Sequence, residues 1–184
     1  MEKILLVDDE PMILKALVRL LQRTPCICDG RLFRLDVITF TDPGMALDYV
    51  REHQVSLVVS DYRMPGMDGV NLLAAIKELQ PEASRIIISG YADLNALVEA
   101  INRANIYRFI AKPWNDYELI STIGQALRHR QLMLENQALA DAGREIVNHK
   151  ADNSKLIKQL EREEPGITKV NWGPDGSVML DDEE

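Results

Sequence analysis

The chain has few cysteines and no long apolar run. Among its 184 residues, Cys26 and Cys28 lie two apart. A mutual disulfide is geometrically awkward at that spacing, and no nearby His or further Cys completes a zinc set, so we expect free thiols. No stretch approaches the roughly 18 apolar residues that span a bilayer, and the first residues lack the design of a signal peptide. We therefore expect a cytoplasmic protein with no membrane segment.

Basic residues are also in the minority. The chain has 21 Lys and Arg against 29 Asp and Glu, which gives a net charge of -8. This balance argues against a strongly electropositive nucleic-acid surface. No helix-turn-helix module follows the first 128 residues, so we expect no direct DNA binding. A length of 184 residues permits one domain and an extension, and 46% hydrophobic with 27% charged residues is typical of a globular protein.

Five short apolar runs alternate with amphipathic stretches. The runs cover roughly 3–8, 33–40, 55–60, 85–89 and 106–111, and helices are predicted near 10–23, 43–53, 69–79, 93–103 and from 115 onward. This alternation is typical of a doubly wound α/β domain with a five-stranded parallel sheet. Arg34 and Asp36 in the second run favour an edge strand, so the expected flavodoxin-like order is 2-1-3-4-5. The segment 24–31 is predicted to be a surface loop.

The second half of the chain lacks proline. None occurs between Pro113 and Pro165, and the intervening residues are mostly good helix formers, so one long helix is predicted. Asn115 should cap its start with Glu118 nearby, as Asp42 should cap the helix that begins at Pro43. About 50 residues would reach roughly 75 Å, far beyond what one side of the sheet needs.

Part of this helix has a heptad pattern. The positions that repeat every seventh residue are Leu132, Leu139, Ile146, Asn153 and Leu160. Gly143 and several polar core positions weaken the pattern, so a solvated, partly frayed helix stays open as an alternative to the two-chain coiled coil that we favour.

Beyond the helix, the sequences at 167–172 and 177–180 flank a Gly/Pro/Asp turn and predict a hairpin, followed by a solvated acidic end. The predicted organisation is therefore a domain at 1–128, an extended helix at 129–164, and a hairpin with an acidic tail at 165–184.

Charged side chains follow three of the apolar runs. Asp8 and Asp9 end the first run, Asp61 ends the third, and Lys112 ends the fifth. In open α/β sheets, ligands collect outside the carboxyl ends of the strands. We therefore expect an acidic pocket with one lysine. Several carboxylates close together attract a hard divalent cation with oxygen ligands, and Mg²⁺ suits an open site of this kind.

These residues together resemble a known family. The pieces are Asp8-Asp9, Asp61 with Met64-Pro65-Gly66-Met67-Asp68-Gly69, Ser89-Gly90 and Lys112-Pro113. In this order and spacing they resemble the CheY-like receiver domain of bacterial two-component response regulators. The resemblance covers about residues 1–128 and is followed by the long helical extension.

The resemblance implies a role for each of these residues. Asp61 would be the phosphoacceptor, and Ser89, Gly90 and Lys112 would bind the phosphoryl group. The implied Mg²⁺ ligands are Asp8, Asp9, Asp61 and the backbone carbonyl of Arg63. Lys112-Pro113 would be a cis peptide. Ser89 and Phe109 would be the switch pair, although phenylalanine lacks the hydroxyl that tyrosine often provides at that position.

The implied function is a phosphorylation-dependent signalling switch. A sensor histidine kinase would be the phosphodonor, and the chain would form a homodimer through the long helix and the output face, with a downstream protein as partner. It would be no enzyme beyond assisting its own phosphorylation and dephosphorylation. Two alternatives stay open. The run 106–115 resembles receivers that precede HD-type cyclic dinucleotide phosphodiesterase or phosphatase modules, and an inert receiver on a structural coiled coil is also conceivable.

Overall fold

Five parallel strands form the central sheet. The computed structural model describes residues 1–90, 103–163, 171–172 and 178–179. The strands are β1 (Glu2–Val7), β4 (Leu35–Phe40), β5 (Leu57–Asp61), β6 (Ser84–Ser89) and β7 (Arg108–Ala111), in the order β4-β1-β5-β6-β7. This confirms the predicted order, including the edge position of the strand with Asp36. The two central strands β5 and β6 are buried along their whole length, because helices cover both faces.

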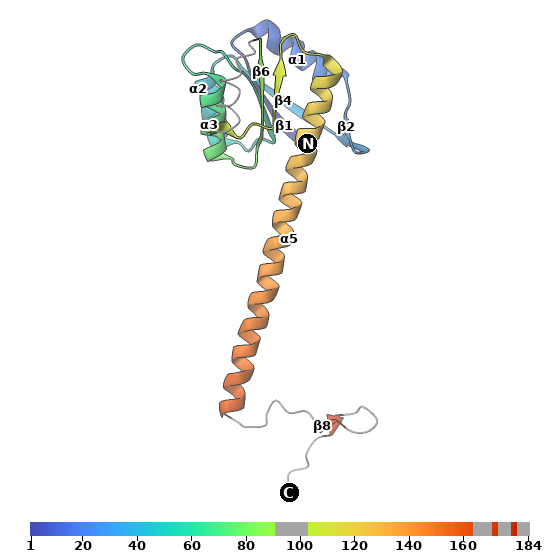
Figure 1. Ribbon diagram of the computed structural model, residues 1–184, viewed down its shortest axis with the longest axis vertical. Coiled ribbons are helices and arrows are strands. Elements are labelled where there is room, and N and C mark those ends of the chain that lie inside the picture. The colour runs from blue at the N-terminus through green and yellow to red at the C-terminus, as the bar shows by residue number, and fades with distance from the viewer. Residues whose placement is uncertain (91–102, 164–170, 173–177, 180–184) are drawn as a thin grey trace. The chain divides into compact units, whose positions relative to one another are not determined.

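Helices cover both faces of the sheet (Figure 1), and an apolar layer lies beneath them on each face. On one face, Ile4 and Leu6 of β1 pack with α1 (Pro11–Arg23) and with the first turns of α5 (Asp116–Glu163). On the other face, Leu5 and Val7 pack with α2 (Pro43–Glu52) and α3 (Gly69–Leu79). Side chains alternate along a strand, so one apolar run supplies both layers. The helix predicted at 93–103 lies outside the described residues, apart from Arg103.

Polar side chains cap three of the helices. The Asp42 side chain accepts a hydrogen bond from the Met45 amide at 2.9 Å, and Asn115 accepts one from the Glu118 amide at 3.1 Å. Both caps confirm the prediction. Asp68 caps α3 in the same way, since its carboxylate accepts from the Asn71 amide at 2.7 Å. This third cap fixes the start of the helix that follows the Asp61 loop.

The predicted surface loop at 24–31 was wrong. Strand β2 (Cys26–Cys28) pairs antiparallel with β3 (Arg31–Phe33). Asp29 and Gly30 form the turn with φ values of 49° and 72°, and an Asp-Gly pair with two positive φ angles is the favoured two-residue hairpin turn. Cys26 is 1% exposed. The Asp-Gly signal was present in the sequence, but the short strands on either side of it concealed the hairpin.

Gly124 of α5 makes room for this hairpin. A Cβ atom there would lie 3.3 Å from the Cβ of Cys28 and 3.4 Å from the Sγ of Cys26. Arg128, one turn further along α5, lies 3.5 Å from the Asp29 carboxylate at the hairpin turn. Both cysteines are free thiols, as expected.

The long helix is confirmed as one element of 48 residues, α5. The chain divides into two units, Met1–Leu134 and Glu135–Glu184. In the first unit, α5 buries Leu119, Ile123 and Leu127. In the second, Leu139 and Leu156 are 71% and 55% exposed. None of the described helices is both long enough and apolar enough to cross a membrane.

Two short strands lie near the C-terminus. β8 (Asn171–Trp172) pairs antiparallel with β9 (Val178–Met179). The other residues of the predicted hairpin and the acidic tail, 164–170, 173–177 and 180–184, lie outside the described residues.

Candidate functional site

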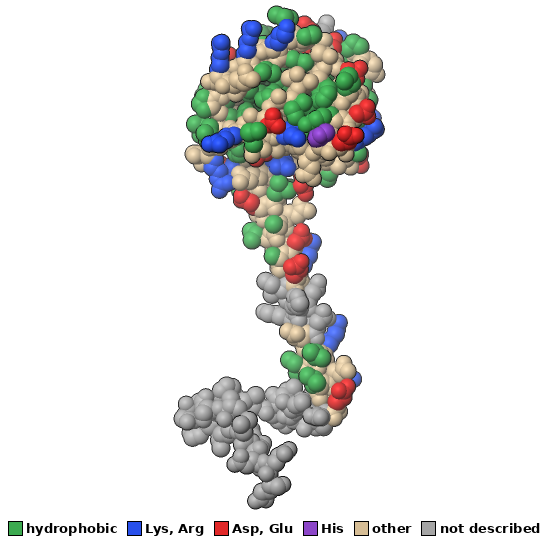
Figure 2. Space-filling view, turned by 180° about the vertical axis from the view of Figure 1, so that it is seen from behind, with side chains coloured by type: hydrophobic (Ala, Val, Ile, Leu, Met, Phe, Trp, Pro, Cys, Tyr) green, Lys and Arg blue, Asp and Glu red, His purple; other side chains and the backbone are tan. Residues whose placement is uncertain are grey.

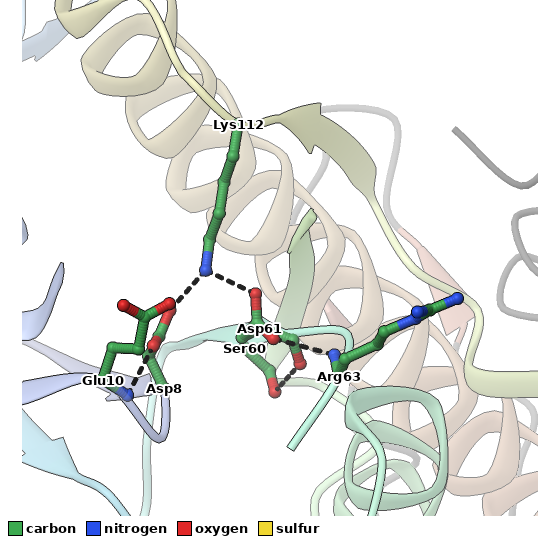
Figure 3. Close-up of polar contacts among 6 residues, drawn as sticks. All are labelled: Asp8, Glu10, Ser60, Asp61, Arg63 and Lys112. Carbon is green, nitrogen blue, oxygen red and sulfur yellow. Dashed lines mark hydrogen bonds and ion pairs between the residues drawn. The ribbon is translucent and has the colours of Figure 1, made fainter. Parts of the chain in front are cut away.

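Three strands bring two carboxylates and one ammonium together. Asp8 follows β1, Asp61 ends β5, and Lys112 follows β7, so all three lie at the carboxyl edge of the sheet (Figure 3). The Lys112 Nζ atom lies 2.8 Å from Asp8 Oδ2 and 2.5 Å from Asp61 Oδ1. The side chains of Asp8 and Asp61 are only 3% and 9% exposed. Such a buried pair of acids needs a cation between them, because unpaired charge is costly away from water.

Backbone amides hold the second oxygen of each carboxylate. The Glu10 amide donates to Asp8 Oδ1 at 2.9 Å, and the Arg63 amide donates to Asp61 Oδ2 at 2.8 Å (Figure 3). In both cases the donor lies two residues after the acid, which is the Asx-turn arrangement. Each side chain is therefore oriented by its own loop, with its other oxygen directed at Lys112.

The electrostatics of the site reflect burial and pairing. Burial raises the pKa of the Asp8 carboxyl above its ordinary value, although the hydrogen bonds from Lys112 and the Glu10 amide oppose the rise. Burial by itself would lower the pKa of Lys112, but the hydrogen bonds to Asp61 and then Asp8 outweigh it and raise that pKa. Lys112 is thus a fixed positive charge at neutral pH, held between two acids.

The start of α3 packs closely against the backbone of Asp61 and so helps to position it. A Cβ atom on Gly69 would fall well inside contact distance of the Asp61 carbonyl oxygen and would lie 3.0 Å from the Ser60 hydroxyl. That hydroxyl in turn donates to the Asp61 carbonyl oxygen at 2.8 Å, and the Gly69 amide donates to the Tyr62 carbonyl at 2.9 Å. The start of α3 therefore lies directly against the end of β5, which only glycine permits at this position.

The Lys112 backbone is anchored to the neighbouring strand. The Lys112–Pro113 peptide bond is cis, which is the geometry that the resemblance implied. The Lys112 amide donates to the Ser89 carbonyl at 2.8 Å. Gly90 lies next to the same lysine, since a Cβ there would be 4.0 Å from the Cβ of Lys112. Ser89 is 3% exposed, and the end of β6 therefore lies directly beside Lys112.

Two of the predicted site residues are not in contact with this cluster. Asp9 is exposed, one residue beyond Asp8. Phe109 is half-buried and packs against the apolar layer of α2 and α3. Among the described residues, no group of three or more His, Cys, Asp or Glu side chains is close enough to hold a metal ion together. The structure therefore assembles Asp8, Asp61 and Lys112, with Ser89 and Gly90 beside them.

The site fits a hard cation by its donor chemistry. The carboxylates of Asp8 and Asp61 each direct one oxygen at the Lys112 Nζ atom. Burial is the main reason why the pKa of Asp8 is raised, and an additional cation beside it would favour the charged carboxylate. Oxygen-rich, acidic surroundings of this kind are those that Mg²⁺ prefers.

The role of Gly69 was not predicted from the sequence. It belongs to the motif that follows Asp61, but nothing in its residue type distinguishes a close backbone approach from an ordinary turn. The cap at Asp68 was detectable, since an Asp directly before an apolar helical stretch is a standard N-cap.

The fold and the site define a flavodoxin-like α/β domain with an acidic pocket and a fixed lysine. The family model described as "Response regulator receiver domain" matches residues 4–124. This span is more than half of the chain. The chain therefore belongs to the response regulator receiver family, the phosphorylation-dependent switches of two-component systems, whose members receive phosphoryl groups from histidine kinases.

Similar proteins agree with this assignment. The hydrogenase transcriptional regulatory protein HoxA of Cupriavidus necator is 37% identical over 129 residues, covering 70% of this chain and 25% of that protein. A receiver domain of an HD domain-containing protein from Pseudomonas fluorescens Pf-5 is 36% identical, with 73% and 92% of the two chains covered and a TM-score of 0.65. A CheY-like receiver domain protein from Methanospirillum hungatei JF-1 is 26% identical, with 72% and 98% covered and a TM-score of 0.62. The chain spans about a quarter of the length of the first curated relatives.

Proposed function

We propose that Asp61 accepts a phosphoryl group from a sensor histidine kinase and that this event changes how the chain meets its partners. The observation that supports the proposal is the position of Lys112, whose Nζ atom lies within hydrogen-bond distance of both Asp61 and Asp8. An ammonium beside the acceptor carboxylate offsets the repulsion between that carboxylate and an arriving anion. In this proposal residues 1–128 are the receiver, 129–164 the extended helix, and 165–184 the hairpin and tail.

The proposed reaction is an in-line transfer. An Asp61 carboxylate oxygen forms a bond to phosphorus while the bond from phosphorus to the kinase's phosphohistidine nitrogen breaks. That nitrogen leaves with the electron pair. Lys112 then donates hydrogen bonds to the phosphoryl oxygens, together with the Ser89 hydroxyl and the Gly90 amide. Beyond this self-modification we assign the chain no catalytic activity.

Mg²⁺ is the cofactor that we propose for this site. When bound, it would neutralise charge on the acids and on the phosphoryl oxygens. Its proposed ligands are Asp8, Asp9, Asp61 and the backbone carbonyl of Arg63. Because Lys112 already pairs with Asp8 and Asp61, part of its contact with these acids must be given up to the ion. We also propose that the chain works in the cytoplasm, because the proposed phosphodonor is a histidine kinase that is itself phosphorylated from ATP there.

The output proposed here is homodimerisation through α5. Leu132, Leu139 and Leu160 occupy one heptad position and are 40%, 71% and 38% exposed. Exposed leucines at seven-residue spacing favour a second helix as their cover, in a coiled coil. We propose that phosphorylation reaches this helix through Ser89 and Phe109 and so alters the dimer or a downstream partner. No direct DNA binding is expected of this chain.

A second candidate is a regulatory role within a larger enzyme. The specific observation in its favour is the likeness to the receiver domain of an HD domain-containing protein at 36% identity. In that case the same phosphorylation would control an attached phosphodiesterase or phosphatase module of the HD type. The receiver chemistry is common to both candidates.

Intact mass spectrometry after incubation with acetyl phosphate and Mg²⁺ tests the acceptor. The wild type should gain one phosphoryl group, and Asp61→Asn should gain none. Lys112→Ala should be phosphorylated about a hundredfold more slowly, whereas Lys77→Ala on α3 serves as the matched control and should react normally. A phosphorylated Asp61→Asn variant would refute the assignment.

Light scattering with and without a beryllofluoride mimic tests the output. The wild type should change in mass or in dimer affinity. A Leu139→Asp variant, with its change at an exposed position, should remain folded and monomeric. Identical mass for both proteins would exclude the helix as the dimer contact.

A further inference from the structure

Strand β4 lies at one edge of the sheet, and within the described residues the backbone groups on its outer side are unpaired. The Glu2 amide donates to the Arg34 carbonyl at 2.7 Å, and the Asp8 amide donates to the Phe40 carbonyl at 3.2 Å. The even-numbered residues of β4 therefore direct their backbone N–H and C=O groups toward β1. Because the direction of these groups alternates along a strand, the N–H and C=O groups of Leu35, Val37 and Thr39 point away from β1. In the described part of the chain no strand pairs with this side of β4.

Two cavities lie along this edge beside α1, and together they are called the groove. These cavities, of about 360 and 500 Å³, lie between the helix and the strand. The first is lined by Leu14, Val18 and Thr39 among others, and the second by Leu35 and Val37. The outward-facing residues of β4 are thus the same residues that line the groove. Strand addition at such an edge gives a peptide both backbone hydrogen bonds and side-chain pockets.

The charge along the groove is of one sign. Lys15, Arg19, Arg23 and Arg34 line the two cavities, and no Asp or Glu does. All four basic residues are exposed. None makes an ion pair within the described residues. In Figure 2, Lys and Arg side chains form a row along the upper left edge of the unit Met1–Leu134, and hydrophobic side chains gather below them.

This pattern is unusual for a chain whose net charge is -8. Lys15, Arg19 and Arg23 recur every four residues, which places them on one side of α1. A row of cations with no acidic neighbour in the groove gives a positive potential that attracts anions. The row lies beside the open strand edge, so one ligand can use both features.

We propose that the groove between α1 and β4 binds an extended acidic segment of a partner protein by strand addition. β4 has six residues, so the segment would span about six residues at roughly 3.3 Å each. Its acidic side chains, at alternate positions, face α1 and meet Lys15, Arg19 and Arg23. Its intervening apolar side chains face the opposite side and extend the layer of Ile38 and Phe40, which are only half-buried.

The charges favour this occupant over two others. A second copy paired through the same edge would bring two rows of cations together, which is unfavourable at short range. A single-stranded nucleic acid would use the charges, but it gains nothing from unpaired strand groups and normally needs aromatic stacking platforms. Phe33 is the one aromatic side chain among the residues that line the two cavities.

The test uses the full chain and three synthetic heptapeptides. The probe is Val-Glu-Val-Glu-Val-Glu-Val. One control has lysine in place of glutamate, and the other has the same composition with its three glutamates adjacent. Binding is measured by calorimetry, and protection by amide hydrogen exchange. The probe should bind saturably and slow exchange at Leu35, Val37 and Thr39 at least tenfold, whereas both controls should not.

Two charge-reversal variants separate this site from general attraction. The double variant Arg19→Glu with Arg23→Glu, at exposed positions of α1, should weaken probe binding at least tenfold. Arg51→Glu, an exposed arginine on α2, should leave it unchanged. Equal binding of the rearranged peptide, full competition by an oligothymidine of equal charge, or absent protection at the three amides would overturn the proposal. Protection of these amides from exchange that appears without peptide and rises with protein concentration would also overturn the proposal, because it would indicate that a second copy of the chain occupies the edge.

Discussion

Replacement of Gly69 by alanine tests how closely the phosphoacceptor strand depends on its support. The added methyl group would lie within the 3.0 Å that real Cβ atoms essentially never cross, with the Asp61 carbonyl oxygen as its neighbour. To reach ordinary contact, either the start of α3 or the end of β5 must move by on the order of 1 Å. Both elements are buried there, so neither can yield without disturbing the core.

The expected magnitudes follow from this displacement. Overpacking of a buried site costs about 1–3 kcal/mol of folding stability. A shift of on the order of 1 Å in a reacting group can slow a reaction about a hundredfold. We therefore expect Gly69→Ala to lose about 1–3 kcal/mol of folding stability in urea unfolding. We also expect acetyl phosphate to phosphorylate it about a hundredfold more slowly than the wild type.

Two controls separate misplacement from loss of stability. Ile76→Val removes one methyl from a fully buried residue of α3 and should cost about 0.5–1.5 kcal/mol while it phosphorylates normally. Gly143→Ala on α5 meets no atom within 4 Å and should stabilise the helix by up to about 1 kcal/mol. If Gly69→Ala is phosphorylated at the wild-type rate, or if Ile76→Val loses as much phosphorylation rate, then the close contact at Gly69 does not position Asp61.

Two further substitutions and one thiol-labelling experiment probe burial and charge. Asp8→Asn should stabilise the magnesium-free protein against urea unfolding at pH 7. Folding raises the pKa of Asp8, so ionisation of this carboxyl favours the unfolded chain. The wild type therefore loses stability as the pH rises from the unfolded-state pKa through the folded-state pKa, and the asparagine variant does not. Cys28 should react with a thiol reagent at pH 8 much faster than Cys26, whose pKa burial raises to about 11. Arg85→Lys should lose about 1–3 kcal/mol, because the buried guanidinium donates to the carbonyls of four residues.

Each of these predictions has its own check. The gain in Asp8→Asn should shrink on acidification toward pH 4 and on addition of Mg²⁺; a gain that is constant across pH would contradict the linkage. Single Cys→Ser variants assign the two labelling rates, and equal rates would mean that the β2–β3 hairpin opens readily. Arg51→Lys, at an exposed position, is the control for Arg85→Lys. It should change folding stability by less than about 0.5 kcal/mol, so a similarly small effect of Arg85→Lys would contradict the prediction.

Most of the sheet was predictable because its strands differ in burial. β5 and β6 each contain a run of three or more adjacent apolar or small residues, whereas β4 has Arg34 and Asp36 at or near its start, and this contrast indicated the interior and one edge of the sheet. The β2–β3 hairpin was missed because its strands have only three residues each. Strands this short give too few alternating positions for a periodicity to appear.

The order of charged residues along the chain determined which side chains meet. Asp8, Asp61 and Lys112 each follow an apolar run, and parallel strands end at the same edge, so their gathering follows from the sequence. The close contacts follow from the folded structure alone: Lys112 bridges two carboxylates, and Gly69 lies against the Asp61 carbonyl. Residue types specify local preferences, but distances between segments far apart in the chain depend on how the whole core packs.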